Sequence, residues 1–269
     1  MPGIGSVGRF RFLEAAPRAD VRSRGALVLI HAFPLSAQMF DAQLAMADRG
    51  WRVIAPHLRG FDGAADDPPA TSIDDYAGDA IDLLDALHID EAVIGGVSMG
   101  GYVAFAMFRH APRYFHAMIL ADTRSQADTP EGVDARKKML QLLQQRGAPA
   151  VADEMIPKLL GETTRRTRPD LVEQVRGWVV ANSADAIAGA IRALMTRPDS
   201  TPLLSTIHCP ALILVGDEDV VTPKPAAEEM HRRITGSRLA IIPGAGHLSN
   251  LEHPDAFNTA LASFLDHQV

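Results

Sequence analysis

Residues 92–108 read AVIGGVSMGGYVAFAMF, and this stretch decides the fold. It carries no charge and is almost long enough to suggest a membrane span. The glycines at positions 95, 96, 100 and 101 would weaken a spanning helix, but they permit a sharp turn. We therefore predict a buried strand over residues 92–97 that turns directly into a buried helix.

Similar runs of Val, Ile and Leu recur on both sides of this stretch. Continuous apolar runs are typical of parallel strands that helices cover on both faces. Helical patterns separate the runs; in residues 73–87 apolar side chains recur at helical spacing, and Ser72 with Asp75 predicts a capped start. The alternation predicts an α/β fold with a mostly parallel central sheet flanked by helices. The expected strands cover residues 26–31, 52–56, 92–97, 117–122, 211–216 and 239–243, and residues 7–13 are a candidate antiparallel edge strand.

The alternation of strand and helix stops between residues 123 and 198. Only helical patterns occur there, at residues 135–145, 150–160, 170–180 and 184–195. We therefore predict an α/β core of residues 1–122 and 199–269 that carries an all-helical insertion of residues 123–198.

Charge separates this insertion from the rest of the chain. Its 12 Lys and Arg against 9 Asp and Glu give a net charge of +3, and the remaining 14 against 24 give −10. Opposite charge would help the insertion to sit on the core. We interpret Arg165, Arg166 and Arg168 as a solvated helix end rather than an anion site.

The composition of the 269 residues excludes several classes of protein. With 47% hydrophobic and 22% charged residues, the chain is an ordinary globular sequence with enough length for a full core. Its net charge of −7 gives no general attraction to nucleic acid or anionic lipid, so neither nucleic acid nor membrane is an expected partner. The single cysteine, Cys209, excludes an internal disulfide and cysteine-based metal centres. We expect no secretion signal and a cytoplasmic location, because the start lacks a basic segment followed by an apolar one.

The pentapeptide Gly96-Val97-Ser98-Met99-Gly100 lies where the predicted strand meets the predicted helix. In that context G-x-S-x-G places a serine on a tight, strained bend. The bend also points the first N–H groups of the helix at the site, where they can stabilise negative charge. Elsewhere the same pentapeptide would be an ordinary turn. Ser98 is therefore the candidate nucleophile.

A serine hydroxyl is a weak nucleophile unless a base removes its proton, so Ser98 requires a histidine that a carboxylate orients. Most of the 10 histidines are poor candidates, since several fall in or at the ends of amphipathic helices. His247 differs, because it lies in the loop Pro243-Gly244-Ala245-Gly246-His247, directly after the last predicted strand. It is the candidate general base.

The orienting acid should follow a strand that lies between Ser98 and His247 in the sequence. Asp217-Glu218-Asp219 follows the predicted strand 211–216. Asp219 is far enough along the loop to reach the imidazole, whereas Asp217 is placed to cap the turn. Asp122, at the end of another predicted strand, is the alternative acid.

In this combination the chain resembles the α/β-hydrolase superfamily, near its small serine esterases, enol-lactonases and cofactor-free peroxidase-like members. His31-Ala32-Phe33-Pro34 resembles the family's His-Gly-x-Pro segment, which implies that the N–H groups of Phe33 and Met99 form an oxyanion hole. Residues 216–219 match the family's Gly-x-x-Asp, and residues 246–247 match its Gly-His. The resemblance implies no cofactor, and no histidine or carboxylate spacing indicates a metal site.

The sequence departs from the family's pattern at two positions. Ala32 replaces a glycine, which we expect to narrow or tilt the oxyanion segment. His57-Leu58-Arg59-Gly60 resembles an Asp-x-Arg-Gly loop, with His57 in place of the aspartate. Because that loop is mainly structural in the family, we expect His57 to alter a surface hydrogen-bond network rather than the chemistry.

The nucleophile narrows the expected reaction. Related dehalogenases and epoxide hydrolases carry an aspartate at this turn, so Ser98 disfavours both activities. We expect hydrolysis of a small ester or lactone through an acyl-enzyme. The same three residues would also serve perhydrolysis or C–C bond hydrolysis, and a ligand-sensing protein is a more distant alternative.

The helical insertion corresponds to the family's cap, which lies over the site and shapes the pocket. One aromatic residue in this insertion, Trp178, favours an aliphatic substrate of modest size, and no oligomeric state is assigned. The candidate apolar face of the insertion comprises Met139, Leu140, Leu143, Met155, Leu159, Leu160 and Trp178.

Overall fold

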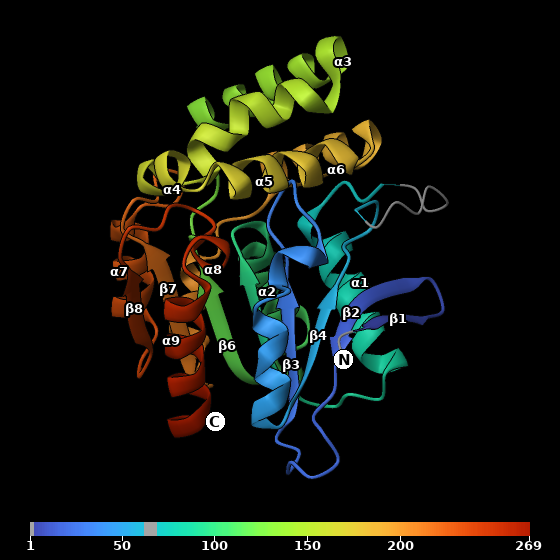
Figure 1. Ribbon diagram of the computed structural model, residues 1–269, viewed down its shortest axis with the longest axis vertical. Helices are drawn as coiled ribbons and strands as arrows, with labels where there is room; N and C mark the ends of the chain where they lie inside the picture. Colours follow the sequence, from blue (N-terminus) through green and yellow to red (C-terminus); the bar gives the residue numbers. More distant parts are fainter. Residues whose placement is uncertain (1–2, 62–68) are drawn as a thin grey trace.

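The computed structural model describes residues 3–61 and 69–269, which form an eight-stranded sheet flanked by helices (Figure 1). The strand order is β1-β2-β4-β3-β5-β6-β7-β8, and every pair from β4 to β8 is parallel. The predicted α/β fold with a mostly parallel sheet is therefore confirmed. The strands are β1 (Gly3–Val7), β2 (Phe10–Ala15), β3 (Gly25–Ile30), β4 (Trp51–Pro56), β5 (Ala92–Val97), β6 (Phe115–Ala121), β7 (Ala211–Gly216) and β8 (Arg238–Ile242).

The prediction of one edge strand over residues 7–13 is wrong, because a turn interrupts that run. Gly8 has a φ of 54°, and Val7 pairs with Phe10 across the turn. The segment is therefore a β-hairpin in which β1 is the edge strand and β2 joins the sheet antiparallel to β4. The apolar alternation could not reveal this break, since Gly8 and Arg9 fall inside it.

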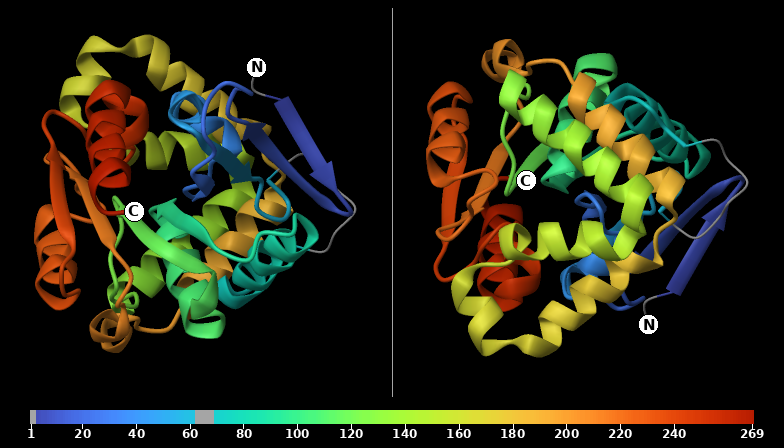
Figure 2. Two further views of the ribbon diagram at one scale, coloured as in Figure 1. Left: turned by 90° about the horizontal axis from the view of Figure 1, so that it is seen from below. Right: turned by 90° about the horizontal axis from the view of Figure 1, so that it is seen from above.

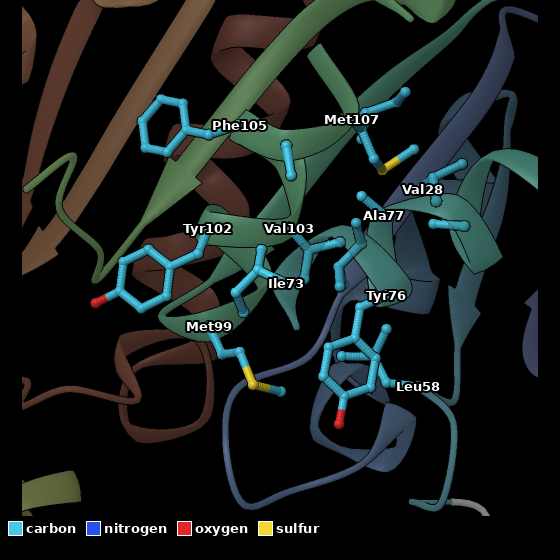
Figure 3. Close-up of a cluster of buried hydrophobic side chains, with 14 of the residues drawn as sticks. Val28, Leu58, Ile73, Tyr76, Ala77, Met99, Tyr102, Val103, Phe105 and Met107 are labelled. Atoms are coloured by element: carbon cyan, nitrogen blue, oxygen red, sulfur yellow. The ribbon is translucent and has the colours of Figure 1, made fainter. Parts of the chain in front are cut away.

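Helices cover both faces of the sheet. On one face lie α1 (Ile73–Ala86), α2 (Met99–His110) and α7 (Lys224–Arg233); Figure 3 shows part of this layer. On the other lie α9 (Pro254–His267) and the 3-10 helices η1 (Ala37–Phe40) and η2 (Gln43–Arg49). Side chains of β3 alternate between the two cores, as a strand between two layers requires. The remaining short helices are η3 (Pro112–Tyr114), η4 (Thr201–Thr206) and α8 (Ser249–Glu252).

Two local predictions about helices are confirmed. The apolar stretch 92–108 forms β5 and α2, and no helix among the described residues combines the length and low charge that crossing a bilayer requires. The α1 helix begins with the predicted cap, in which the Asp75 N–H donates to Ser72 Oγ and the Ser72 N–H donates to Asp75 Oδ2.

The helical insertion is present between β6 and β7, and Figures 1 and 2 show its helices as a layer at one end of the sheet. Two predicted helices occupy α3, whose halves meet at Gly147 with φ 74° and ψ −175°. The backbone is not helical at that residue, so α3 consists of two segments, residues 130–146 and 148–159. The insertion consists of α3 (Pro130–Leu159), α4 (Glu162–Thr167), α5 (Pro169–Ala181) and α6 (Ala184–Thr196).

Candidate active site

Ser98 occupies a strained turn between β5 and α2. Its φ of 54° is rare for a residue with a side chain, and its N–H donates to the Ala121 carbonyl oxygen at 2.9 Å. A Cβ on Gly96 would overlap the Gly100 carbonyl, and one on Gly100 would overlap the Ile30 carbonyl oxygen. Both glycines are therefore required by the close approach of backbone to backbone, which holds Ser98 at the end of the sheet.

The structure joins Ser98, His247 and Asp219 by two hydrogen bonds. His247 Nε2 lies 2.7 Å from Ser98 Oγ, and His247 Nδ1 lies 2.8 Å from Asp219 Oδ2. In this arrangement the serine hydroxyl donates to Nε2, while Nδ1–H donates to the carboxylate. All three residues are buried, so these bonds form away from bulk water.

Asp219 is fixed by the loop that follows β7. Its Oδ1 accepts the N–H groups of Val221 at 2.8 Å and Thr222 at 2.9 Å. The Thr222 hydroxyl donates to Oδ2 at 2.7 Å. Burial opposes ionisation of Asp219, but the charge of His247 and these hydrogen bonds outweigh it and lower the pKa of the carboxyl. Asp219 is therefore an ionised, oriented acceptor for the imidazole.

Asp122, the alternative acid, has a different set of partners. Its Oδ1 accepts the Gly216 N–H at 2.9 Å, and its Oδ2 contacts the Ser249 N–H and hydroxyl. It thereby joins the end of β6 to the end of β7 and the start of α8. Burial and the neighbouring charge of Asp219 raise the pKa of Asp122. The structure thus brings Asp219, and not Asp122, into hydrogen-bonding contact with His247.

His247 is electrostatically prepared to accept a proton. Complete burial opposes the imidazolium, but the charge of Asp219 and its hydrogen bond outweigh burial and raise the pKa of His247. A proton taken from Ser98 would therefore be stabilised on the imidazole.

Phe33 and Met99 are the two residues whose N–H groups the sequence assigns to an oxyanion hole. Met99 is the first residue of α2, where an N–H group has no acceptor within the helix. Phe33 follows β3 and lines the same cavity as Ser98. These placements are compatible with the roles that the sequence predicts for their N–H groups.

His31 fixes the turn that carries Phe33. Its Nδ1–H donates to the Ala32 carbonyl oxygen at 3.0 Å, and its Nε2 accepts the Leu58 N–H at 3.0 Å. Burial lowers the pKa of His31 to about 3, so the ring is neutral and can serve as both donor and acceptor. Ala32 is buried and does not adopt a positive φ, which explains why this position accepts a side chain.

Glu252 secures the loop that carries His247, and sequence reasoning missed it. Its Oε1 accepts the N–H groups of Gly246 at 2.9 Å and Leu248 at 3.2 Å, one on each side of the histidine. Its Oε2 accepts the N–H of Gly161, in the helical insertion, at 2.9 Å. One buried carboxylate therefore links the histidine loop to the insertion.

A small cavity opens at Ser98 and His247. Of the seven predicted apolar residues of the insertion, Met155 and Leu159 line it. Sequence reasoning missed two arginines of this cavity, Arg124 and Arg136, since no local pattern marks them. The other lining residues are Phe33, Tyr102, Leu194 and Val221.

The remaining sequence-predicted positions lie elsewhere. His57 follows β4, where its N–H donates to the Arg11 carbonyl oxygen at 3.0 Å, and it lines a cavity other than that of Ser98. Arg165 and Arg166 are exposed on α4, as expected for a solvated helix end. Asp217 accepts the Gly244 N–H at 2.6 Å and so ties together two loops beside the site.

Known proteins resemble this chain over most of its length. The profile described as the Alpha/beta hydrolase family matches residues 27–260. 3-Oxoadipate enol-lactonase 2 of Acinetobacter baylyi is 28% identical over 90% of this chain and 89% of its own. A pimeloyl-[acyl-carrier protein] methyl ester esterase of Neisseria meningitidis serogroup C is 29% identical over 88% and 92%. A malate-bound thermophilic esterase from Thermogutta terrifontis superposes with a TM-score of 0.88 at 33% identity, covering 99% of this chain and 98% of that one.

Proposed function

This chain belongs to the α/β-hydrolase family, and we propose that it is a serine hydrolase of small carboxylic esters or lactones. The observation that carries the proposal is the chain of hydrogen bonds from Ser98 through His247 to Asp219 at the floor of a cavity. Nucleophile, base and orienting acid stand in the order that acyl transfer requires.

In the first half of the reaction, Ser98 Oγ attacks the substrate carbonyl carbon while His247 Nε2 takes the hydroxyl proton. Asp219 stabilises the imidazolium that results. The N–H groups of Phe33 and Met99 hold the oxyanion of the tetrahedral intermediate. His247 then returns the proton to the leaving alkoxide, and an acyl-enzyme remains on Ser98.

In the second half, water attacks the acyl carbon. His247 takes a proton from the water and later gives it to Ser98 Oγ, so that the acid leaves and the hydroxyl is restored. In a lactone the leaving alcohol remains attached to the acyl group, so both halves of the reaction yield one hydroxy acid.

We assign residues 123–198 to a cap and residues 1–122 with 199–269 to the core that carries Ser98. The position of α3–α6 over the end of the sheet and the presence of Met155 and Leu159 in the cavity wall support this division (Figure 1). The names of the relatives support the reaction class, since they comprise a lactonase and ester hydrolases.

A panel of short-chain and medium-chain esters and simple lactones tests the proposal. Wild type should turn over members of the panel, and Ser98→Ala should lower kcat by about 10⁴-fold or more. Ser263→Ala, on the exposed side of α9, is the matched control and should behave as wild type. Mass spectrometry should find an acyl adduct on Ser98 during turnover.

Two results would remove the proposal: no turnover of any ester or lactone by folded wild type, or unchanged turnover by Ser98→Ala. Parallel assays for perhydrolysis and for cleavage of diketones separate hydrolysis from the other reactions that these three residues can perform.

A further inference from the structure

Two arginine side chains line the same cavity as Ser98 and His247. Arg124 lies in the segment between β6 and α3, and Arg136 lies in the first half of α3. Their side chains are 29% and 20% exposed, so both are half-buried in the protein. Cations at this depth require anionic partners.

Among the described residues, both arginines pair with the carboxylate of Asp128, whose side chain is 2% exposed. It accepts from Arg124 Nη2 at 2.9 Å and from Arg136 Nε, and Arg197 Nη1 lies 2.9 Å away. Three guanidinium groups therefore share one negative charge, and the cluster has a net charge of +2.

The three arginines differ in what else they contact. Arg197 donates to the carbonyl oxygens of Leu194 and Gln126, and its guanidinium stacks on the Tyr102 ring at 4.2 Å. Arg197 therefore has a structural role.

Arg124 and Arg136 retain unused donors. Arg124 Nε is buried without an acceptor, as Arg197 Nε also is, and Arg136 donates through Nε alone to the residues that the structure describes. Unlike Arg197, Arg124 and Arg136 line the cavity of Ser98. A guanidinium has five N–H donors in a planar fork that matches a carboxylate. The cavity wall thus holds surplus positive charge and surplus donors beside the candidate nucleophile.

Resting on the proposed function, we propose that Arg124 and Arg136 form a subsite for a carboxylate of the substrate. The preferred substrates are then esters or lactones that carry a second, ionised carboxyl group, such as half-esters of short dicarboxylic acids. Met155, Leu159 and Leu194 line the same cavity and provide an apolar wall for the methylene groups between the two ends of the substrate.

A pair of substrates of nearly equal shape tests this subsite. Monomethyl glutarate carries a carboxylate where the methyl ester of glutaric acid monoamide carries a neutral amide. Wild type should favour the acid by about tenfold to a hundredfold in kcat/KM, because hydrogen bonds to a charged partner are the stronger ones.

Variants of the two arginines test whether these residues cause the preference for the acid over the amide. Arg124→Met and Arg136→Met should each lower kcat/KM for the acid by about tenfold and leave the amide within about threefold. Arg136→Lys, which keeps the charge but loses the fork, should lie between wild type and Arg136→Met. Arg176→Met is the matched control, because Arg176 pairs with Asp153 outside the cavity and its loss should change neither substrate.

Wild type alone provides a second test if the substitutions disturb the fold around Asp128. Glutarate should inhibit turnover of the neutral ester more strongly than its diamide does, and added salt should weaken that inhibition. Equal kcat/KM for acid and amide in wild type would overturn the subsite. Equal losses for both substrates in the arginine variants would do so as well.

Failure of the proposed function has a different signature, namely that folded wild type cleaves neither ester. Calorimetric titration of wild type with glutarate then still tests the subsite. Binding that Arg124→Met and Arg136→Met weaken supports it, and absence of binding overturns it.

Discussion

The two walls of the cavity differ in how their polar groups are partnered. On the core side, both nitrogens of His247 and both oxygens of Asp219 have hydrogen-bond partners within the protein. On the insertion side, Arg124 and Arg136 share Asp128 and retain unused donors. On the core side, which would perform the chemistry, these polar atoms are satisfied within the protein. On the insertion side, which would select the substrate, some hydrogen-bond donors remain available to a ligand.

The difference follows from how the chain builds each wall. Ser98, Asp219 and His247 each lie just beyond the end of a strand of one parallel sheet, so backbone pairing sets their spacing. Arg124 likewise follows β6 by three residues, whereas Arg136 extends from α3 in the layer over the sheet. The proposed chemistry is therefore anchored at the ends of the strands, and the proposed carboxylate subsite joins one such end to the layer above it.

The largest effect should distinguish the two buried carboxyl groups of the core wall. We expect Asp219→Asn to lower kcat by about 10³- to 10⁴-fold, because the imidazole loses the charge that stabilises its protonated form. Asp122→Asn should cost about tenfold or less, since Asp122 does not contact the imidazole. Steady-state kinetics on both variants, with circular dichroism as the folding control, provides the comparison. A greater loss from Asp122→Asn would reverse the assignment.

The next effect tests the junction between the two walls. A Cβ on Gly246 would overlap the backbone of Gly161, so Gly246→Ala should destabilise the protein by about 1–3 kcal/mol and displace the histidine loop. We expect kcat to fall by about a hundredfold, because small displacements of reacting groups are costly.

Gly177→Ala on α5 provides the control for Gly246→Ala. Its Cβ would meet no neighbour, so it should stabilise the helix by about 1 kcal/mol or less and leave kcat unchanged. Denaturant unfolding and kinetics measure both variants. Wild-type turnover by Gly246→Ala would show that the two walls do not depend on this contact.

Glu252 offers a milder way to loosen the same junction. Glu252→Gln keeps the shape but places an amide group against N–H donors, so we expect a loss of about 1–3 kcal/mol in unfolding free energy. kcat should fall by about tenfold, because the loop that carries His247 loses part of its support. Glu154→Gln, which breaks an exposed pair with Lys158, should cost less than about 0.5 kcal/mol. Equal effects of the two substitutions would contradict the role of Glu252.

The smallest effect lies in the pH profile. The reaction needs neutral His247, so kcat/KM for an uncharged ester should rise with pH, with its midpoint above the ordinary histidine pKa of about 6.5. Asp219 contributes most to raising that pKa, so Asp219→Asn should move the midpoint of its residual activity to lower pH. A midpoint that stays in place or rises in the variant would contradict this coupling.

Much of the fold followed from the sequence because local patterns encode it. Continuous apolar runs predicted the parallel strands, and the cap of α1 followed from Ser72 and Asp75. The prediction of a single edge strand was wrong because two residues, Gly8 and Arg9, turn the chain within an alternating run. The helices predicted at residues 135–145 and 150–160 correspond to the two halves of α3, residues 130–146 and 148–159, on either side of the non-helical Gly147.

The candidate site divides in the same way. Ser98 and His247 stood out because their loops have local signatures, but Asp122 and Asp219 both follow strands, and the sequence only favoured the second. The structure distinguishes them through the N–H groups of Thr222 and its neighbour, which face Asp219. Arg124, Arg136 and Glu252 have no local sequence signature. Their roles depend on contacts with residues that are distant in the sequence.

The break in α3 at Gly147 separates two segments that contact different parts of the site. The segment before it carries Arg136, and the segment after it carries Met155 and leads to the contact with the histidine loop. Substitutions in residues 130–146 can therefore alter the cavity without altering the contacts that hold the loop of His247. If the chain is the hydrolase that we propose, we expect substitutions in residues 130–146 to change its substrate preference more readily than its reaction.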